Sequence, residues 1–295
     1  MKKIIAVCCL LGFIYSAKAQ DSIVIKKVEY PAGYSEQLNV IYTRVKGWDG
    51  KMDLYLPAKE RGLSPVVINI HGGGWNKGNK ESQTGFSSFL KKGYAVANIA
   101  YRLTPTAAAP AAVEDTRCAL IYLIKNAKEL NIDISKIVIM GSSSGGHLAL
   151  MGGLLQNNHL FDTNCTGVEN VKVAAIIDKY GIADVWDWAY GPNKTSKSAI
   201  SWLGDKAKNE SFAKSVSPLT YVTKTSPPVF IVHGDADPTV PYQQSQELYK
   251  KLSAAGVKTE FITVEGGLHG KFPQEKNSEV NAKIIAFLKD LGIHK

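Results

Sequence analysis

Glycine-flanked reactive residues occur at three places in the sequence, and the first contains three serines. Residues 141–145 read Gly-Ser-Ser-Ser-Gly directly after the apolar run KIVIM, so they fit the pattern G-x-S-x-G with Ser143 in the middle. Glycines in this pattern allow a tight turn from a strand into a helix, which lifts the central side chain clear of the sheet. Ser142 and Ser144 have the wrong register. Ser143 is therefore the candidate nucleophile.

The second place is HGGGW, residues 71–75, which follows the apolar run VVINI. A serine that attacks a carbonyl carbon creates an oxyanion, and a set of fixed backbone N–H donors stabilises it best. Successive glycines let the backbone approach without side-chain obstruction. We predict that Gly73 and Gly74 contribute donors, together with the N–H of Ser144. His71 is predicted to brace the loop.

The third place is a pair of later segments, which supply an acid and a base. GDADPTVP follows the apolar run VFIVH and contains Asp235 and Asp237, while the later loop GGLHG contains His269. Asp237 is favoured as the acid because it lies further past the strand end and can reach the next loop, whereas Asp235 suits a proline-associated turn. The chain order Ser, Asp, His indicates a triad in which Asp237 orients His269 beside Ser143.

The remaining histidines are weaker candidates. His147 lies on the helix that follows the serine turn and is expected to point away from it, so we interpret it as structural. His159 lies in a polar stretch, His233 ends a strand, and His294 is next to the C-terminus.

Hydrophobic periodicity predicts the elements that must position these residues. Alternating patterns at 39–45 and 51–57 predict half-exposed strands. Continuous apolar runs predict buried parallel strands at 66–70, 94–100, 136–140, 173–178 and 229–233. Helical patterns occur at 111–130, 242–256 and 280–292. The fold class is therefore α/β, with a mostly parallel central sheet, helices on both faces and an antiparallel hairpin at its start. Such sheets place their chemistry at the carboxyl ends of the strands.

One irregular region, at about 181–216, is too long for an ordinary connection and predicts a small cap-like insertion over the site. It contains Trp186, Trp188 and Trp202 among Gly, Asn, Ser and Lys. Aromatic faces stack on sugar or phenolic rings, so Trp75, Trp186 and Trp188 are the predicted substrate contacts. The alternative is that these side chains pack the cap onto the domain.

The N-terminus predicts export. Residues 1–19 combine a basic start, a short apolar stretch and the small-residue pattern AKA, which is typical of a signal peptide cleaved after Ala19. Residues 20–295 would then form one catalytic domain, secreted or periplasmic in a bacterium, with no stable membrane insertion after cleavage. The formal net charge is +9, but the lysines are scattered and no nucleic-acid-binding motif accompanies them, so we expect no nucleic-acid partner.

Two cysteines, Cys118 and Cys165, remain after the predicted leader. Their spacing fits neither a zinc site nor a disulfide framework, and export permits a bridge whose formation depends on their proximity. Cys118 lies in an apolar helical segment, which favours buried packing. No cluster of metal ligands occurs at a recognisable spacing, so no metal is expected.

Together these motifs resemble the α/β-hydrolase family, and closely its esterase branch with HGGGW and G-x-S-x-G-G. The likeness extends from KMDLYLPA to GGLHG, most of the chain beyond the leader. That branch includes secreted bacterial feruloyl and acetyl-xylan esterases, hormone-sensitive-lipase-like esterases and kynurenine formamidases. The resemblance implies Ser143, Asp237 and His269 as a triad that needs no cofactor. Ser144 stands where many relatives have Ala, a small departure because only its backbone N–H is required.

The leading hypothesis is a secreted serine carboxylesterase that hydrolyses short-chain acyl or feruloyl esters of plant-polysaccharide-derived carbohydrates. Its partner would be a small-molecule or oligosaccharide ester. A prolyl-oligopeptidase-like peptidase is an alternative, although such enzymes normally have a large additional N-terminal domain. A formamidase is another, although export fits intracellular tryptophan catabolism poorly. A catalytically inactive hydrolase used for binding would have no need of a complete triad.

Overall fold

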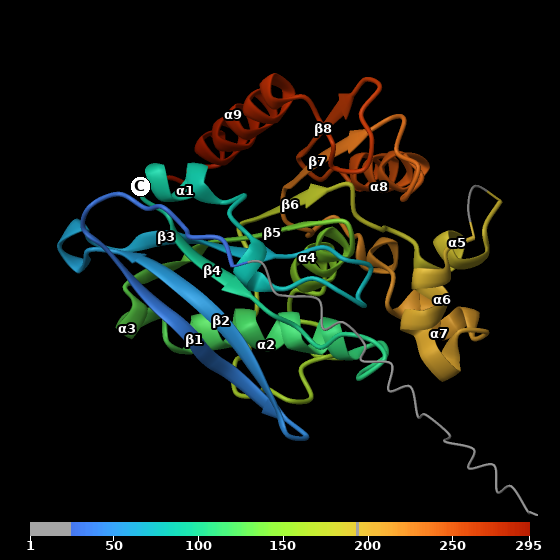
Figure 1. The fold of residues 1–295 in the computed structure, drawn as a ribbon, viewed down its shortest axis with the longest axis horizontal. Coiled ribbons are helices and arrows are strands. Elements are labelled where there is room, and N and C mark those ends of the chain that lie inside the picture. Colours follow the sequence, from blue (N-terminus) through green and yellow to red (C-terminus); the bar gives the residue numbers. More distant parts are fainter. Residues whose placement is uncertain (1–24, 193–194) are drawn as a thin grey trace, which may run out of the picture.

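A single eight-stranded sheet forms the centre of the protein, in a computed structural model that describes residues 25–192 and 195–295 (Figure 1). The predicted signal peptide, residues 1–19, lies outside the described residues. The strands are β1 (Tyr34–Val45), β2 (Trp48–Pro57), β3 (Ser64–Ile70), β4 (Ala95–Ile99), β5 (Ile132–Ser142), β6 (Ala175–Lys179), β7 (Val229–Gly234) and β8 (Thr259–Val264). Their order across the sheet is β1-β2-β4-β3-β5-β6-β7-β8.

The strand directions confirm the predicted sheet. β1 pairs with β2 and β2 with β4 in antiparallel register, whereas every neighbouring pair from β4 to β8 is parallel. All seven residues of β3 are buried, as the continuous apolar run predicts for a central parallel strand. The carboxyl ends of the parallel strands therefore meet at one edge of the sheet.

Helices cover both faces of the sheet, as predicted. α1 (Ser87–Lys91) and α9 (Gln274–Asp290) pack on one face, where Phe89 and Phe287 belong to one apolar cluster. α2 (Ala111–Lys125), α4 (Ser144–Leu154) and α8 (Gln243–Ala254) contribute to a second, larger cluster on the other face (Figure 1). No helix in the described part of the chain is long and apolar enough to cross a membrane.

Two helix boundaries differ from those predicted. The helical pattern at 111–130 is divided at Asn126 into α2 and a short α3 (Ala127–Leu130). The side-chain amide of Asn126 donates to the carbonyl of Tyr122 at 2.8 Å, which is the local competition by which asparagine interrupts helices. The last helix begins at Gln274, one and a half turns before the apolar pattern, because its first residues are exposed and polar.

In its described residues, the connection from β6 to β7 forms three short helices and two 3₁₀ turns. The helices are α5 (Val185–Tyr190), α6 (Lys197–Leu203) and α7 (Glu210–Ser215), and the turns are Gly204–Lys206 and Pro218–Tyr221. Asp184, Ser196 and Asn209 cap the three helices, each accepting a backbone N–H through its side chain. Figure 1 shows these helices together at one side of the sheet, as expected of a small insertion.

A disulfide joins Cys118 on α2 to Cys165, and the two Cα atoms are 5.4 Å apart. Cys118 is buried, as its apolar surroundings predict, but it is also cross-linked. The chain between them includes the loop after α4, which the buried ion pair of Arg117 and Asp162 also attaches to α2. Sequence alone could not decide on the bridge, since the approach of this loop to α2 is a tertiary contact.

We predict that Cys165→Ser lowers the free energy of unfolding by about 2–4 kcal/mol, because the bridge closes a long loop in the unfolded chain. The measurement is denaturant unfolding with and without dithiothreitol. Reductant should lower the stability of the wild type to that of the variant and leave the variant unchanged. Equal stability of the oxidised wild type and the variant would contradict this expectation.

Candidate active site

The structure brings Ser143, His269 and Asp237 together at the carboxyl edge of the sheet. Ser143 follows β5, Asp237 follows β7 and His269 follows β8. The hydroxyl oxygen of Ser143 lies 2.8 Å from Nε2 of His269, and Nδ1 of His269 lies 2.6 Å from Oδ2 of Asp237. The three side chains thus form one continuous hydrogen-bonded chain.

Ser143 is held in a conformation that few residues adopt. Its backbone has φ 56° and ψ −124°, and its N–H donates to the carbonyl of Lys179 at 2.9 Å. The turn also requires the following glycine. A Cβ on Gly145 would lie 2.3 Å from the carbonyl oxygen of Ile70, so only glycine lets the start of α4 pack this closely on the end of β3. This packing presents the Ser143 side chain outward.

The hydrogen-bond partners fix the proton on His269. Asp237 is ionised and can only accept, so Nδ1 of His269 carries the proton and Nε2 is free to accept from the Ser143 hydroxyl. His269 is 21% exposed at its side chain, and Asp237 is fully buried there. This arrangement can remove a proton from Ser143 while the resulting imidazolium remains paired with a carboxylate.

Asp237 accepts four hydrogen bonds. Oδ1 accepts from the backbone N–H of Thr239 at 2.7 Å and of Val240 at 3.0 Å, and Oδ2 accepts from His269 and from Nε2 of His233 at 3.1 Å. Burial by itself raises the pKa of Asp237, but the hydrogen bonds from His233, His269 and Thr239 outweigh it and hold this pKa well below its usual range. The carboxylate therefore remains ionised.

Asp235 has a different environment. It is exposed, and its Oδ1 accepts the backbone N–H of Gly266 at 2.7 Å, so it attaches its own turn to the loop that leads to His269. The carboxylate nearer the strand end thus contacts backbone, and the one further along reaches the histidine.

The HGGGW loop lies beside Ser143. Gly73 has φ 123°, and a Cβ there would lie 2.1 Å from the carbonyl oxygen of Lys77, so the loop can close only around glycine. Gly73 and Gly74 line the same pocket as Ser143. Ser144 is the first residue of α4, so its N–H has no acceptor within the helix. Gly73 and Gly74 therefore border the space beside Ser143, and Ser144 lies directly behind it as the buried first residue of α4.

His71 lies beneath this loop. Its ring stacks on Tyr101 with 4.3 Å between centroids, and the Tyr101 hydroxyl donates to the His71 carbonyl at 3.1 Å. Burial lowers the pKa of His71 to about 4, although a hydrogen bond from the ring to the carbonyl of Gly72 acts in the opposite direction. His71 is therefore a neutral, packed ring next to the glycines.

The tryptophans divide between the core and the pocket. Trp75 is 0% exposed and stacks on Trp202 at 4.3 Å between centroids, with His147 edge-on to both rings. Trp186 contacts Tyr190 and is not among the described residues that line the pocket of Ser143. The structure thus does not bring Trp75 or Trp186 to the expected position: Trp75 is buried against a second indole, and Trp186 packs on Tyr190 away from the pocket. Trp188 does line the pocket, and its N–H donates to the carbonyl of Thr239.

The pocket that contains Ser143 has a volume of about 760 Å³. Besides the predicted residues, Tyr180 lines it and packs edge-on against His269, with 4.9 Å between ring centroids. The insertion contributes 195–198, where Ser198 lies close to Gly74. Sequence reasoning missed Tyr180, although its place directly after the β6 strand was a usable signal.

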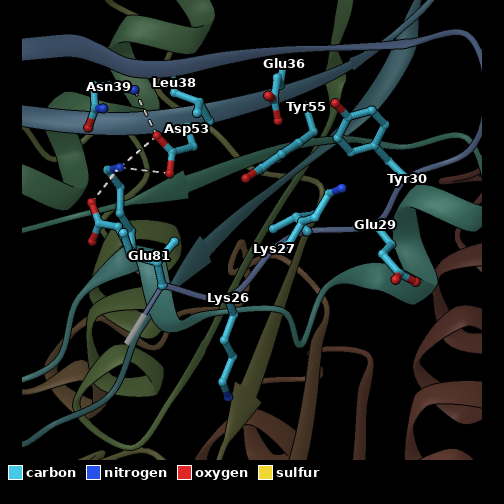
Figure 2. A pocket seen from close by; sticks show the side chains of 13 residues that line it. Lys26, Lys27, Glu29, Tyr30, Glu36, Leu38, Asn39, Asp53, Tyr55 and Glu81 are labelled. Atoms are coloured by element: carbon cyan, nitrogen blue, oxygen red, sulfur yellow. Dashed lines mark hydrogen bonds and ion pairs between the residues drawn. The ribbon is translucent and has the colours of Figure 1, made fainter. Parts of the chain in front are cut away.

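A larger cavity of about 910 Å³ lies elsewhere, beneath residues 25–30, and contains none of the predicted site residues. Figure 2 shows its wall, which includes Asp53 and Glu81. The buried ammonium group of Lys80 pairs with Asp53 at 2.7 Å and with Glu81 at 2.8 Å. Because these charges are already paired with one another, we assign the chemistry to the smaller pocket. In 25–192 and 195–295 no three His, Cys, Asp or Glu side chains are grouped so as to hold a metal ion.

Fold and site together define a class of protein. A mostly parallel sheet with a serine on a strand-to-helix turn, and with an aspartate and a histidine after two later strands, is the architecture of an α/β-hydrolase. A sequence profile of the family described as BD-FAE matches residues 52–252. The chain therefore belongs to the BD-FAE family, in the esterase branch of the α/β-hydrolases that its sequence resembles.

Two of the curated relatives are esterases by name. Esterase LipQ of Mycobacterium tuberculosis is 28% identical over 201 residues, which cover 66% of this chain and 47% of LipQ. Esterase LipC of the same organism is 24% identical over 216 residues, which cover 70% of this chain and 53% of LipC. The chain spans about half the length of these relatives.

Solved structures give similar matches. A truncated form of a carbohydrate esterase from gut microbiota has a TM-score of 0.75 at 29% identity, covering 88% of this chain and 99% of that one. A bifunctional GH43-CE protein of Bacteroides eggerthii has a TM-score of 0.77 at 29% identity, covering 87% and 35%. Propionate-bound esterase 2 of Thermogutta terrifontis has a TM-score of 0.74 at 25% identity, covering 89% and 96%.

The buried His147 predicts a pH dependence of stability. Burial lowers the pKa of His147 to about 4, although the hydrogen bond to the carbonyl of Val216 opposes this shift. Between the unfolded pKa of about 6.5 and about 4, the unfolded chain takes up a proton that the folded protein excludes. We therefore expect the free energy of unfolding to fall as the pH falls through this window, by up to about 1.4 kcal/mol per pH unit for this group.

The measurement is denaturant unfolding at a series of pH values, for the wild type and for His147→Gln, whose amide can still donate to Val216. The variant should have a shallower slope below about pH 6.5. His71 is present in both proteins, so the difference isolates His147. If the free energy of unfolding changed with pH in the same way in both proteins, His147 would bind its proton equally well in the folded and unfolded states, contrary to this prediction.

Proposed function

We propose that the protein is a serine esterase whose triad is Ser143, His269 and Asp237. The observation that supports this most directly is the hydrogen-bonded chain from the Ser143 hydroxyl through His269 to a buried, ionised Asp237, which opens onto a pocket. Membership of the BD-FAE family and the esterase names of its relatives agree with this chemistry.

The proposed reaction has two halves. Oγ of Ser143 attacks the acyl carbon while its proton passes to Nε2 of His269, and the imidazolium then gives that proton to the leaving alcohol oxygen as the ester C–O bond breaks. Water attacks the acyl-enzyme in the same way, and the acid is released with Ser143 restored. Asp237 holds the histidine in the required tautomer and stabilises the imidazolium throughout.

The oxyanion of each tetrahedral intermediate would be bound by backbone N–H groups of Gly73, Gly74 and Ser144. This assignment is supported by their positions, because Gly73 and Gly74 line the pocket that contains Ser143, and Ser144 follows Ser143 at the N-terminus of α4. Rigid donors of this kind need no reorganisation when negative charge develops on the oxygen, which is what makes them effective.

For the substrate we propose short-chain acyl or feruloyl esters on plant-polysaccharide-derived carbohydrates. The proposal is supported by the two structural relatives described as a carbohydrate esterase and as a GH43-CE protein, and by the predicted export through residues 1–19. Trp188 adds aromatic surface to the wall of this pocket, although its side chain is only 3% exposed and offers no open ring face. In its described residues the insertion consists of short capped helices, with no long apolar lid of the kind that a lipase would use.

Ser143→Ala should reduce kcat on 4-nitrophenyl acetate by about four to six orders of magnitude, because the nucleophile is lost while the fold is kept. A fluorophosphonate probe should label the wild type and not the variant. Ser142→Ala is the matched control and should keep most activity. If both substitutions abolished turnover equally, the assignment of the nucleophile would be wrong.

The substrate class is tested by comparing kcat/KM on acetylated xylo-oligosaccharide, methyl ferulate and an emulsified long-chain triglyceride. We expect the carbohydrate acetate or the ferulate to be cleaved much faster than the triglyceride. Faster turnover of the emulsified lipid would exclude the carbohydrate-ester proposal and leave the serine hydrolase. Preferential cleavage of a prolyl peptide or of N-formylkynurenine would instead support the alternatives of a peptidase or a formamidase.

A further inference from the structure

A second imidazole contacts the carboxylate of Asp237. Nε2 of His233 lies 3.1 Å from Oδ2 of Asp237, the same oxygen that accepts from Nδ1 of His269 at 2.6 Å. A carboxylate oxygen has two lone pairs, so two imidazole donors use Oδ2 completely. The two backbone donors on Oδ1 do the same on the other side, so the carboxylate is held at each of its four lone-pair positions.

The neighbours of His233 determine its tautomer. Besides Asp237, its Nε2 faces the carbonyl oxygen of Val240 at 3.2 Å, and neither an ionised carboxylate nor a carbonyl can donate. Nε2 must therefore carry a proton. Nδ1 lies 2.7 Å from Oγ of Ser245, whose hydroxyl can rotate to donate to it, so every polar atom of a neutral imidazole is satisfied.

His233 is buried and separate from the substrate space. It ends β7 and has no exposed side-chain surface, and it is not among the described residues that line the Ser143 pocket. The titratable groups that face it are Asp237 from the following turn, Tyr180 from the β6 end and Tyr242 ahead of α8, with ring centroids of the two tyrosines at 6.4 and 5.7 Å.

We propose that His233 is a positioning residue for the triad: a neutral imidazole that donates from Nε2 to Asp237 and so directs the remaining lone pair of Oδ2 at His269. The proposal rests on the proposed function, since it concerns how the acid of that triad is held. His233 acts through Asp237 and touches neither the substrate space nor Ser143.

Two physical consequences follow from this second donor. It restricts rotation of the carboxylate, because Oδ2 would otherwise be held only by the partly exposed His269. It also shares the negative charge of Oδ2, so that removing the donor should leave His269 facing a more basic carboxylate and favour its protonated form. The first effect lowers kcat, and the second moves the acid limb of the pH–rate profile to higher pH.

The test uses three variants of the full chain. His233→Leu removes the donor at similar volume, His233→Gln keeps a donor at the position of Nε2, and Ser245→Ala disturbs the same buried site without touching the bond to Asp237. On 4-nitrophenyl acetate, His233→Leu should lower kcat by about 10- to 100-fold with KM unchanged, as for loss of a hydrogen bond to a charged group. His233→Gln and Ser245→Ala should stay within about threefold of the wild type.

The pH–rate profile separates positioning from packing. The acid limb of kcat/KM should move to higher pH in His233→Leu and remain in place in the other two variants. Equal losses of kcat in His233→Leu and Ser245→Ala, with no movement of the acid limb, would show that His233 only fills space and would overturn the proposal. Full activity of His233→Leu would overturn it as well.

A measurement on the wild type needs no turnover and also covers the case in which His233→Leu fails to fold. In ¹⁵N-histidine NMR of the folded protein we expect His233 to carry its proton on Nε2 with a bare Nδ1, as its contacts require. A proton on Nδ1 alone, or a doubly protonated ring, would overturn the proposal. Absence of ester turnover in a wild type with the expected tautomer would instead count against the proposed function.

Discussion

Parallel pairing from β4 to β8 is the constraint on which the site depends. It places the carboxyl ends of those strands at one edge, so the loops after β3, β5, β6, β7 and β8 converge although more than a hundred residues separate Ser143 from His269. The serine turn fits there because Gly145 lets α4 start against the end of β3. The strained backbone of Ser143 is thus supported by the most buried part of the sheet.

The buried, ionised carboxylate of Asp237 must be stabilised by hydrogen-bond donors, and most of these donors come from residues close to it in the chain. Thr239, Val240 and His233 lie within four residues of it, and only His269 comes from another loop. A buried charge is stable when its hydrogen-bonding positions are filled. The turn that contains Asp237 therefore holds the carboxylate largely without the help of His269. This suits an acid whose role is to orient that histidine.

An aromatic cluster connects three separate parts of the site. Trp75 comes from the glycine loop, His147 from the helix after Ser143, and Trp188 and Trp202 from the insertion, with their rings in stacked or edge-on contact. Fully buried rings pack at fixed distances, so this cluster holds the loop and the insertion relative to the nucleophile helix. Of these four rings, only that of Trp188 also lines the pocket. Its side chain therefore contacts both the buried cluster and the pocket beside Ser143.

The sequence by itself determined the sheet, the helices on both of its faces and the strand ends that carry Ser143, Asp237 and His269. Strand periodicity and glycine-bounded turns are local, and strands of this class end at one edge. The same reasoning could not place side chains whose partners lie far along the chain. The tertiary structure alone decided that Cys118 meets Cys165 and that Trp75 is buried under a second indole. Such contacts depend on how elements pack against one another, and no short-range pattern records that packing.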